Sequence, residues 1–139
     1  MTALADTSFV LAMLNKADRN HSACLEVYAS DANILMPQSV LTETAYMLSS
    51  RIGLRATTDF LDGLATSNFE VVALDPDDIK RTSQLLRTYA DTRVDFVDAS
   101  VAAVAERYGA TQIFTLDRRD FGIIRPAHTD YFEILPAGA

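Results

Sequence analysis

Two aspartates stand directly after short apolar runs that have the composition of buried strands. Asp6 follows the run 3–5, and Asp117 follows the run 113–116. In open α/β sheets the ligand crevice lies outside the carboxyl ends of the strands, so we expect both carboxylates to point into one crevice. Each residue could also cap the helix that follows it, which is the more frequent role of a single aspartate at such a position. The presence of a pair weakens that explanation.

A third acid stands on the segment 96–108, which has helical periodicity. With Val97 as reference and about 100° per residue, Val101 shares its apolar face and Asp98 lies about 100° away, at the border of the buried face. Asp95 falls at about 160°, on the solvated side, where it suits the N-cap. We predict that Asp98 contributes to chemistry and Asp95 caps the helix, although an acid in the first turn also suits the helix dipole.

Glu43 stands on a long helix expected to end near Arg51. The expected core stripe of that helix consists of Leu41, Ala45, Leu48 and Ile52. Glu43 lies nearly opposite, which predicts a solvated side chain. Its neighbours Tyr46 and Met47 are apolar, however, so periodicity leaves open whether both faces are covered.

Four carboxylates in one crevice would require a cation, because they cannot all stay ionised without a compensating positive charge. Oxygen ligands without clustered Cys or His select Mg²⁺ or Mn²⁺ over zinc. The chain has 19 acids and 12 bases, a net charge of −7, which argues against a protein that binds nucleic acid through basic side chains alone. A bound metal would let such an acidic protein hold phosphates.

Other chemistries find little support. The sequence has no nucleophile elbow, phosphate-binding loop, dinucleotide-binding motif or CxxC pair. Cys24 lies in an apolar helical stretch and is predicted to be a buried small hydrophobe. His21 and His128 fall in loops or at helix starts, and their spacing supports no histidine site. Arg118 and Arg119 directly follow Asp117; such a pair is more often a solvated surface, and a phosphate clamp is the alternative.

The pattern predicts one domain, residues 1–139, in which strands and helices alternate. Expected strands are 2–5, 33–36, 69–74, 112–116 and 131–135. Expected helices start near Thr7 and cover 22–29, 37–51, 54–66, 76–90 and 96–108, with a short helical segment near Arg118. Strands separated by helices predict an α/β three-layer sandwich with a mostly parallel central sheet.

Composition predicts a soluble protein of the cytoplasm. No stretch approaches the ~18 apolar residues of a membrane span. A single cysteine allows no internal disulfide. The N-terminus has no basic start before its apolar run, so we expect no secretory signal and a mature chain that begins near residue 1.

Four acidic segments, in order, resemble the motifs of the PIN-domain nucleases, most closely those of the VapC-type toxins of bacterial toxin–antitoxin pairs. The segments are ADTSF at 5–9, TE at 42–43, VDAS at 97–100 and TLDRRDF at 115–121, and the likeness extends from about Leu4 to Pro136. The resemblance implies a parallel α/β fold and Mg²⁺-dependent endonucleolytic cleavage of RNA, with Mn²⁺ as an alternative ion. The bound ion would lower the pKa of a water and stabilise charge on the phosphate.

The resemblance also assigns residues and partners. Its acidic quartet falls on Asp6, Glu43, Asp98 and Asp117, which reverses the expectation for Glu43. Asp6, Asp98 and Asp117 would hold metal, and Glu43 would complete the shell or orient the attacking water. Ser8 and Thr115 match supporting hydroxyls, and Asp120 is an extra acid that could reach the metal through water. A toxin of this kind implies a cognate antitoxin, which would bring basic side chains to the acids, and a homodimer.

Two rival interpretations remain. A phosphotransferase with an aspartate nucleophile usually carries a second acid two residues later and a late lysine, whereas here residue 8 is Ser8 and no lysine follows Lys80. A non-catalytic module of the same fold could use the acidic crevice to bind a basic peptide. Intact acids at all four positions argue against that second alternative without excluding it.

Overall fold

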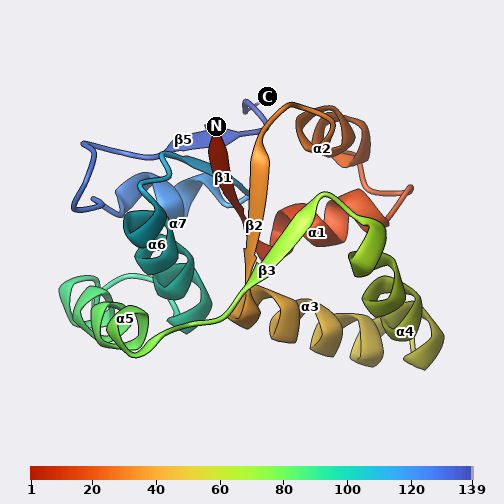
Figure 1. Ribbon diagram of the computed structural model, residues 1–139, viewed down its shortest axis with the longest axis horizontal. Coiled ribbons are helices and arrows are strands. Elements are labelled where there is room, and N and C mark those ends of the chain that lie inside the picture. The colour runs from red at the N-terminus through yellow and green to blue at the C-terminus, as the bar shows by residue number, and fades with distance from the viewer. Residues whose placement is uncertain (139) are drawn as a thin grey trace.

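The first strand, β1 (Thr2–Ala5), is the centre of a five-stranded sheet in the computed structural model, which describes residues 1–138 (Figure 1). The other strands are β2 (Asn33–Pro37), β3 (Phe69–Val72), β4 (Gln112–Phe114) and β5 (Glu133–Leu135). Their order is β3-β2-β1-β4-β5, and every pairing is parallel. All five strands therefore end at one edge, where the ligand crevice of such a sheet lies.

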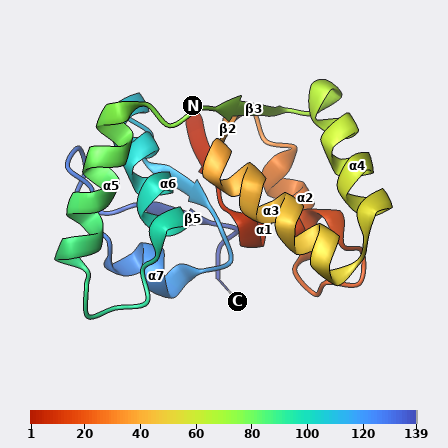
Figure 2. The same ribbon diagram turned by 90° about the horizontal axis from the view of Figure 1, so that it is seen from below.

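The helices cover both faces of this sheet. They are α1 (Thr7–Leu14), α2 (His21–Tyr28), α3 (Gln38–Arg51), α4 (Leu54–Gly63), the 3-10 turn η1 (Leu64–Thr66), α5 (Pro76–Thr88), α6 (Phe96–Tyr108) and α7 (Arg118–Ile123). Figures 1 and 2 show α1 to α4 on one side of the central strands and α5 to α7 on the other. The predicted three-layer sandwich is confirmed, and its sheet is parallel throughout.

The core is densest where β1 and β4 meet the flanking helices. Leu4 and Ile113 are completely buried on neighbouring strands, and the rings of Phe9 and Phe114 lie 5.3 Å apart between centroids. Helix α6 is buried on most of its circumference, because it lies between α5 and the sheet (Figure 2). An acid near its start is therefore drawn into a low-dielectric environment.

Ion pairs hold α5 against α6. The guanidinium of Arg107 donates to both carboxylate oxygens of Asp78 at 2.9 to 3.1 Å, and Asp78 is only 3% exposed. Arg81 binds both oxygens of Glu106 at 2.7 and 3.0 Å. Paired guanidinium–carboxylate contacts are strong hydrogen bonds, so they hold the C-terminal half of α6 against α5.

Several predicted boundaries need correction. Pro37 ends β2, paired with Val72 of β3, and does not open the next helix; its ψ of 146° is extended backbone. The expected helix 54–66 closes at Gly63 and continues only as a 3-10 turn. Three strands are shorter than predicted, because their apolar runs continue into the loops that follow or precede the sheet. Among residues 1–138, no helix has the length and apolar character to cross a membrane.

Candidate active site

Asp6 stands at the carboxyl end of β1 and is 5% exposed. It occupies the N-cap position of α1, but its side chain makes no capping hydrogen bond. Its Oδ2 instead accepts from Thr115 Oγ1 at 2.8 Å and from Ser8 Oγ at 3.2 Å. The capping alternative is thus wrong for the side chain of Asp6, which faces the end of β4.

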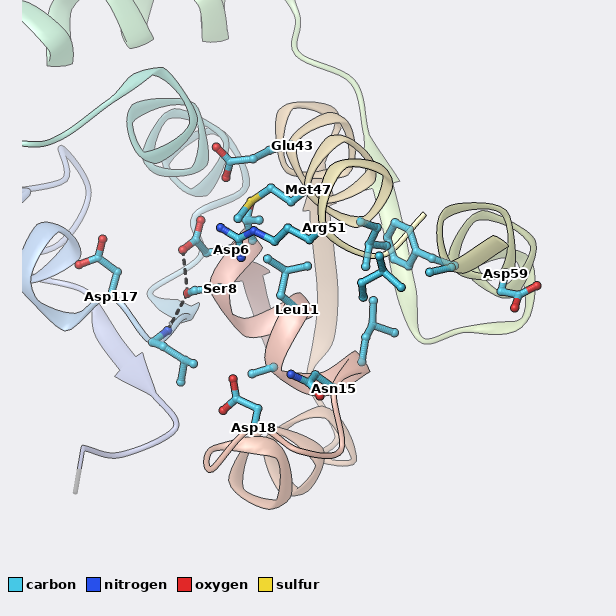
Figure 3. Close-up of a pocket in the computed structure, with 18 of the residues that line it drawn as sticks. Asp6, Ser8, Leu11, Asn15, Asp18, Glu43, Met47, Arg51, Asp59 and Asp117 are labelled. Carbon is cyan, nitrogen blue, oxygen red and sulfur yellow. Dashed lines mark hydrogen bonds between the residues drawn. The ribbon is translucent and has the colours of Figure 1, made fainter. Parts of the chain in front are cut away.

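The two hydroxyls form a bridge between β1 and β4. Ser8 Oγ accepts from the Leu116 amide at 3.0 Å, and Thr115 Oγ1 accepts from the Asp117 amide at 2.9 Å. Each hydroxyl therefore receives one backbone hydrogen bond and donates to Asp6, which fixes the carboxylate. Figure 3 shows the hydrogen bonds of Ser8. The two hydroxyls lie where they can support this site, as the resemblance implies.

Burial makes the charge on Asp6 costly. It raises the pKa of Asp6 from 3.8 to about 6, against the opposing effect of the hydrogen bonds from Thr115 and Ser8, and the charge of Glu43 raises this pKa further. An acid held in this way favours a nearby cation, because a cation lowers the free energy of its ionised form.

Asp95 and Asp98 form a reciprocal capping box at the start of α6. Asp95 Oδ1 accepts from the Asp98 amide at 2.9 Å, and Asp98 Oδ2 accepts from the Asp95 amide at 3.1 Å. Asp95 is exposed, as expected of a cap, whereas Asp98 is 8% exposed. Burial raises the pKa of Asp98 to about 8, and the charges of Asp95 and Asp6 act in the same direction.

Asp117 and Asp120 complete an acidic cluster with Asp98. One carboxylate oxygen from each of the three lies within 4.8 Å of the others. Asp117 also caps α7, since its Oδ1 accepts from the Asp120 amide at 3.0 Å. Burial raises the pKa of Asp120, and the charge of Asp117 adds to that rise, while Arg93 and Arg119 oppose it.

This cluster fits a hard divalent cation. Three carboxylates at this separation offer the all-oxygen donor set that Mg²⁺ and Mn²⁺ prefer. The family resemblance implied Asp6 as a direct ligand and Asp120 as a more distant acid, whereas the close group of three contains Asp120. Asp6 lies near enough for its charge to raise the pKa of Asp98. The four acids therefore surround one region of negative potential.

Glu43 lies half-buried on α3. The buried residues of this helix are Val40, Thr44 and Leu48, and Ile52 is 72% exposed. The expected stripe was thus rotated by about 70°, and with the correct stripe Glu43 lies at its edge rather than opposite to it. Glu43 is therefore half-buried at the groove, which resolves the question that periodicity left open.

A groove of about 940 Å³ is lined by acidic and by apolar side chains. The predicted quartet of Asp6, Glu43, Asp98 and Asp117 lines one end of it. Apolar residues of α1, α3 and α4 also line it, namely Leu11, Met47 and Phe60. Figure 3 labels the first two of these. An open groove with carboxylates at one end can admit a phosphate chain to a bound cation.

Arg51 also lines the groove and was not singled out from the sequence. The signal that could have found it is its spacing, because Glu43, Met47 and Arg51 are four residues apart and share one helix edge. Arg118 lies elsewhere: its NH1 donates to the carbonyls of Ile134 and Pro136, at 3.2 and 2.9 Å. It ties the C-terminal segment to α7, which disfavours the phosphate-clamp alternative for Arg118.

The remaining reactive residues have structural roles. Cys24 is completely buried, as predicted, and burial raises its pKa to about 11. His21 Nδ1 lies 3.0 Å from the Ala12 carbonyl, and His128 Nε2 lies 2.6 Å from the Ala110 carbonyl. Both imidazoles are thus paired with backbone, outside the acidic cluster.

Comparisons with known proteins agree with this geometry. The PIN domain sequence pattern matches residues 3–125. Ribonuclease VapC26 of Mycobacterium tuberculosis is 31% identical over 134 residues, which are 96% of this chain and 99% of that protein. The crystal structure of Mycobacterium tuberculosis VapC20, described as a sarcin–ricin loop cleaving toxin, superposes with a TM-score of 0.79 at 25% identity, over 92% of this chain and 98% of that one. VapBC2 from Rickettsia felis, bound to a promoter DNA fragment, shares the fold with a TM-score of 0.72 at 19% identity, over 96% and 98% of the two chains.

Proposed function

The chain belongs to the PIN-domain family, and from this premise we propose that it is a metal-dependent endoribonuclease, the toxin of a cytoplasmic toxin–antitoxin pair. The observation that carries the proposal is the convergence of Asp98, Asp117 and Asp120 within 4.8 Å, beside the buried Asp6. Similarity to a protein named as a ribonuclease over nearly the whole chain supports the same reaction.

The acidic and hydroxyl residues of the site have different roles in the proposed cleavage. Asp98, Asp117 and Asp120 would hold the cation, and Asp6 lies near enough for its charge to act on Asp98. A bound Mg²⁺ or Mn²⁺ supplies positive charge at the scissile phosphate and lowers the pKa of a water. Thr115 and Ser8 fix the Asp6 carboxylate through their hydrogen bonds. Glu43, which lines the same end of the groove, would orient the attacking water and accept its proton.

The decisive experiment is cleavage of structured RNAs with Mg²⁺, with Mn²⁺ and with EDTA. The panel includes a hairpin of the sarcin–ricin loop, because a relative is described as cleaving it. We expect cleavage with either metal, none with EDTA, and none by Asp98→Asn or Asp117→Asn. Asp59→Asn is the matched control, because Asp59 lines the same groove but its side chain is 72% exposed. Cleavage that persists in EDTA or in both active-site variants would overturn the assignment.

The antitoxin is proposed from the charge and shape of the groove. Toxin–antitoxin complexes from several bacteria share this fold. A partner segment carrying Arg or Lys would pair with the carboxylates, and an apolar stripe on it would fill the apolar part of the groove near Phe60. To test for this partner, the product of an adjoining short reading frame is co-expressed with the chain. We expect the two proteins to co-purify and the complex to lose RNA cleavage. Full cleavage by the co-purified complex would contradict it.

A homodimer is proposed from an apolar surface that adjoins the groove at Glu43, a residue that lines both hollows. Tyr46 and Phe96 are 71% and 48% exposed and border a second hollow of about 540 Å³, together with Leu74 and Val97. Exposed apolar patches of this kind mark protein contacts. Light scattering on the purified protein should give a mass of two chains. The Tyr46→Arg variant should give the mass of a single chain. A monomeric wild type would refute the dimer without affecting the nuclease.

A further inference from the structure

Arg51 has an unusual position for a basic side chain. Seven carboxylates line the groove, and among the described lining residues Arg51 is the only cation. It is the last residue of α3, and Glu43 stands two turns earlier on the same edge of that helix. Figure 3 shows its side chain extending beside Met47 in the direction of Asp6. A positive charge thus stands at the border of the acidic end.

No carboxylate of residues 1–138 lies within the 4.0 Å of an ion pair with the Arg51 guanidinium. By contrast, Arg81 and Arg107 are bound to carboxylates at 2.7 to 3.1 Å. Attraction to the helix dipole would account for a basic residue in the last turn. That attraction acts at the terminal carbonyls of α3, whereas the Arg51 side chain extends along the groove in the direction of Asp6 (Figure 3).

We propose that Arg51 binds a phosphate of the RNA that neighbours the scissile phosphate. This inference rests on the proposed nuclease function and adds a substrate contact to it. The metal ion neutralises the acids only where it is bound, so adjoining phosphates of the chain still meet the negative charge of the groove. A guanidinium offers two parallel N–H donors to a phosphate, which both neutralises and orients it. Among the described lining residues, Arg51 is the one basic side chain that can contact such a phosphate from the groove wall.

The test measures binding of a fluorescein-labelled RNA hairpin by anisotropy, with Ca²⁺ in place of Mg²⁺ and KCl raised in steps. We expect Arg51→Gln to weaken binding about 10- to 100-fold, as the loss of a paired charge-assisted contact does. The slope of log affinity against log salt should fall by about 0.7 to 0.9, the value of one phosphate contact. In cleavage assays KM should rise by a similar factor, with a smaller change in kcat.

Two further variants separate this contact from other effects. Arg51→Lys keeps the charge and loses the paired donors, so it should restore the salt slope but only part of the affinity. Arg55→Gln is the matched control, because Arg55 is 95% exposed and pairs with Asp59 at 3.9 Å outside the acidic end. The Arg55→Gln variant should bind the hairpin with wild-type affinity and salt slope. Melting temperatures of all three should match the wild type, because both arginines are exposed.

The outcomes distinguish this inference from its premise. If the wild type cleaves RNA but Arg51→Gln keeps the wild-type affinity and salt slope, the phosphate contact is refuted. If in addition that variant loses only its affinity for an acidic protein partner, Arg51 belongs to that interface. If the wild type neither cleaves nor binds RNA, the proposed function fails, and this inference falls with it.

Discussion

Replacing Asp6 with asparagine removes a negative charge from a buried position while keeping the shape of the side chain. The amide oxygen can still accept from Thr115 Oγ1 and Ser8 Oγ, which lie 2.8 and 3.2 Å from the carboxylate. The neighbouring Asp98 also loses a like charge that raises its pKa. We expect Asp6→Asn to abolish cleavage and, in the metal-free protein at neutral pH, to raise the melting temperature.

The magnitude follows from the pKa of Asp6. A carboxyl whose pKa rises from 3.8 in the unfolded chain to about 6 in the folded one favours unfolding once it is ionised, and the cost at pH 7.5 is about 3 kcal/mol. The sign is set by proton binding, because between pH 4 and pH 6 the folded state holds more protons than the unfolded state. Stability therefore falls as pH rises through this window. About 3 kcal/mol corresponds to roughly 10 °C in a chain of this length.

The assay is thermal unfolding of both proteins in EDTA at pH 4 and pH 7.5. The two proteins should melt together at pH 4, where Asp6 is protonated, and the variant should melt roughly 10 °C higher at pH 7.5. Added Mg²⁺ should raise the melting temperature of the wild type more than that of the variant, because the form that binds the ion more tightly is stabilised more. Asp59→Asn changes an exposed groove residue, so it should leave the melting temperatures at pH 4 and pH 7.5 unchanged. Equal melting temperatures of wild type and Asp6→Asn at pH 7.5 would refute the reasoning.

Three other predictions address the supporting structure. Asp98→Asn should abolish cleavage of an RNA hairpin, whereas Asp95→Asn should keep most of it, because an asparagine still caps a helix. Loss of cleavage in both variants would show that Asp95 itself is needed for the reaction. Thr115→Val removes a hydrogen bond that lowers the pKa of the buried carboxylate after β1, so the acidic limb of the pH–rate profile should move to higher pH; an unmoved limb would contradict this. Arg107→Ala leaves the buried Asp78 without its guanidinium and should cost about 3 kcal/mol in urea unfolding, and a loss below about 0.5 kcal/mol would show that the pair does not hold α5 against α6.

The fold was predictable because local and tertiary signals agree in this chain. Apolar runs bounded by acids became strands, and Gly109, with φ of 66°, ended α6 where the sequence predicted. The distinction between Asp95 and Asp98 was also predictable, because a cap must face solvent and the third residue of the same turn faces inwards. Local sequence decides such questions, since both residues belong to one helix start.

The composition of the acidic cluster was less predictable, because it depends on the position of the short helix α7 relative to α6. Asp120 follows Asp117 by three residues on α7, so the cap and its first turn bring both carboxylates to the same place. The pair Arg118 and Arg119 illustrates the same limit. Arg118 reaches the carbonyl of Ile134, a contact across 16 positions that no local pattern reports.

Glu43 shows where periodicity misplaces a buried stripe and why. The apolar residues of α3 were assigned to a stripe from Leu41 to Ile52, yet the sheet contacts Val40, Thr44 and Leu48, and the hydroxyl of Thr44 lies completely buried. A threonine in the core and an isoleucine in solvent rotate the buried stripe by about 70° from the expected one. That rotation is enough to carry a carboxylate from solvent to the groove wall. An acid on a helix that is apolar almost all round is therefore assigned by which neighbours cover each face, and here α1 and α6 both pack against α3.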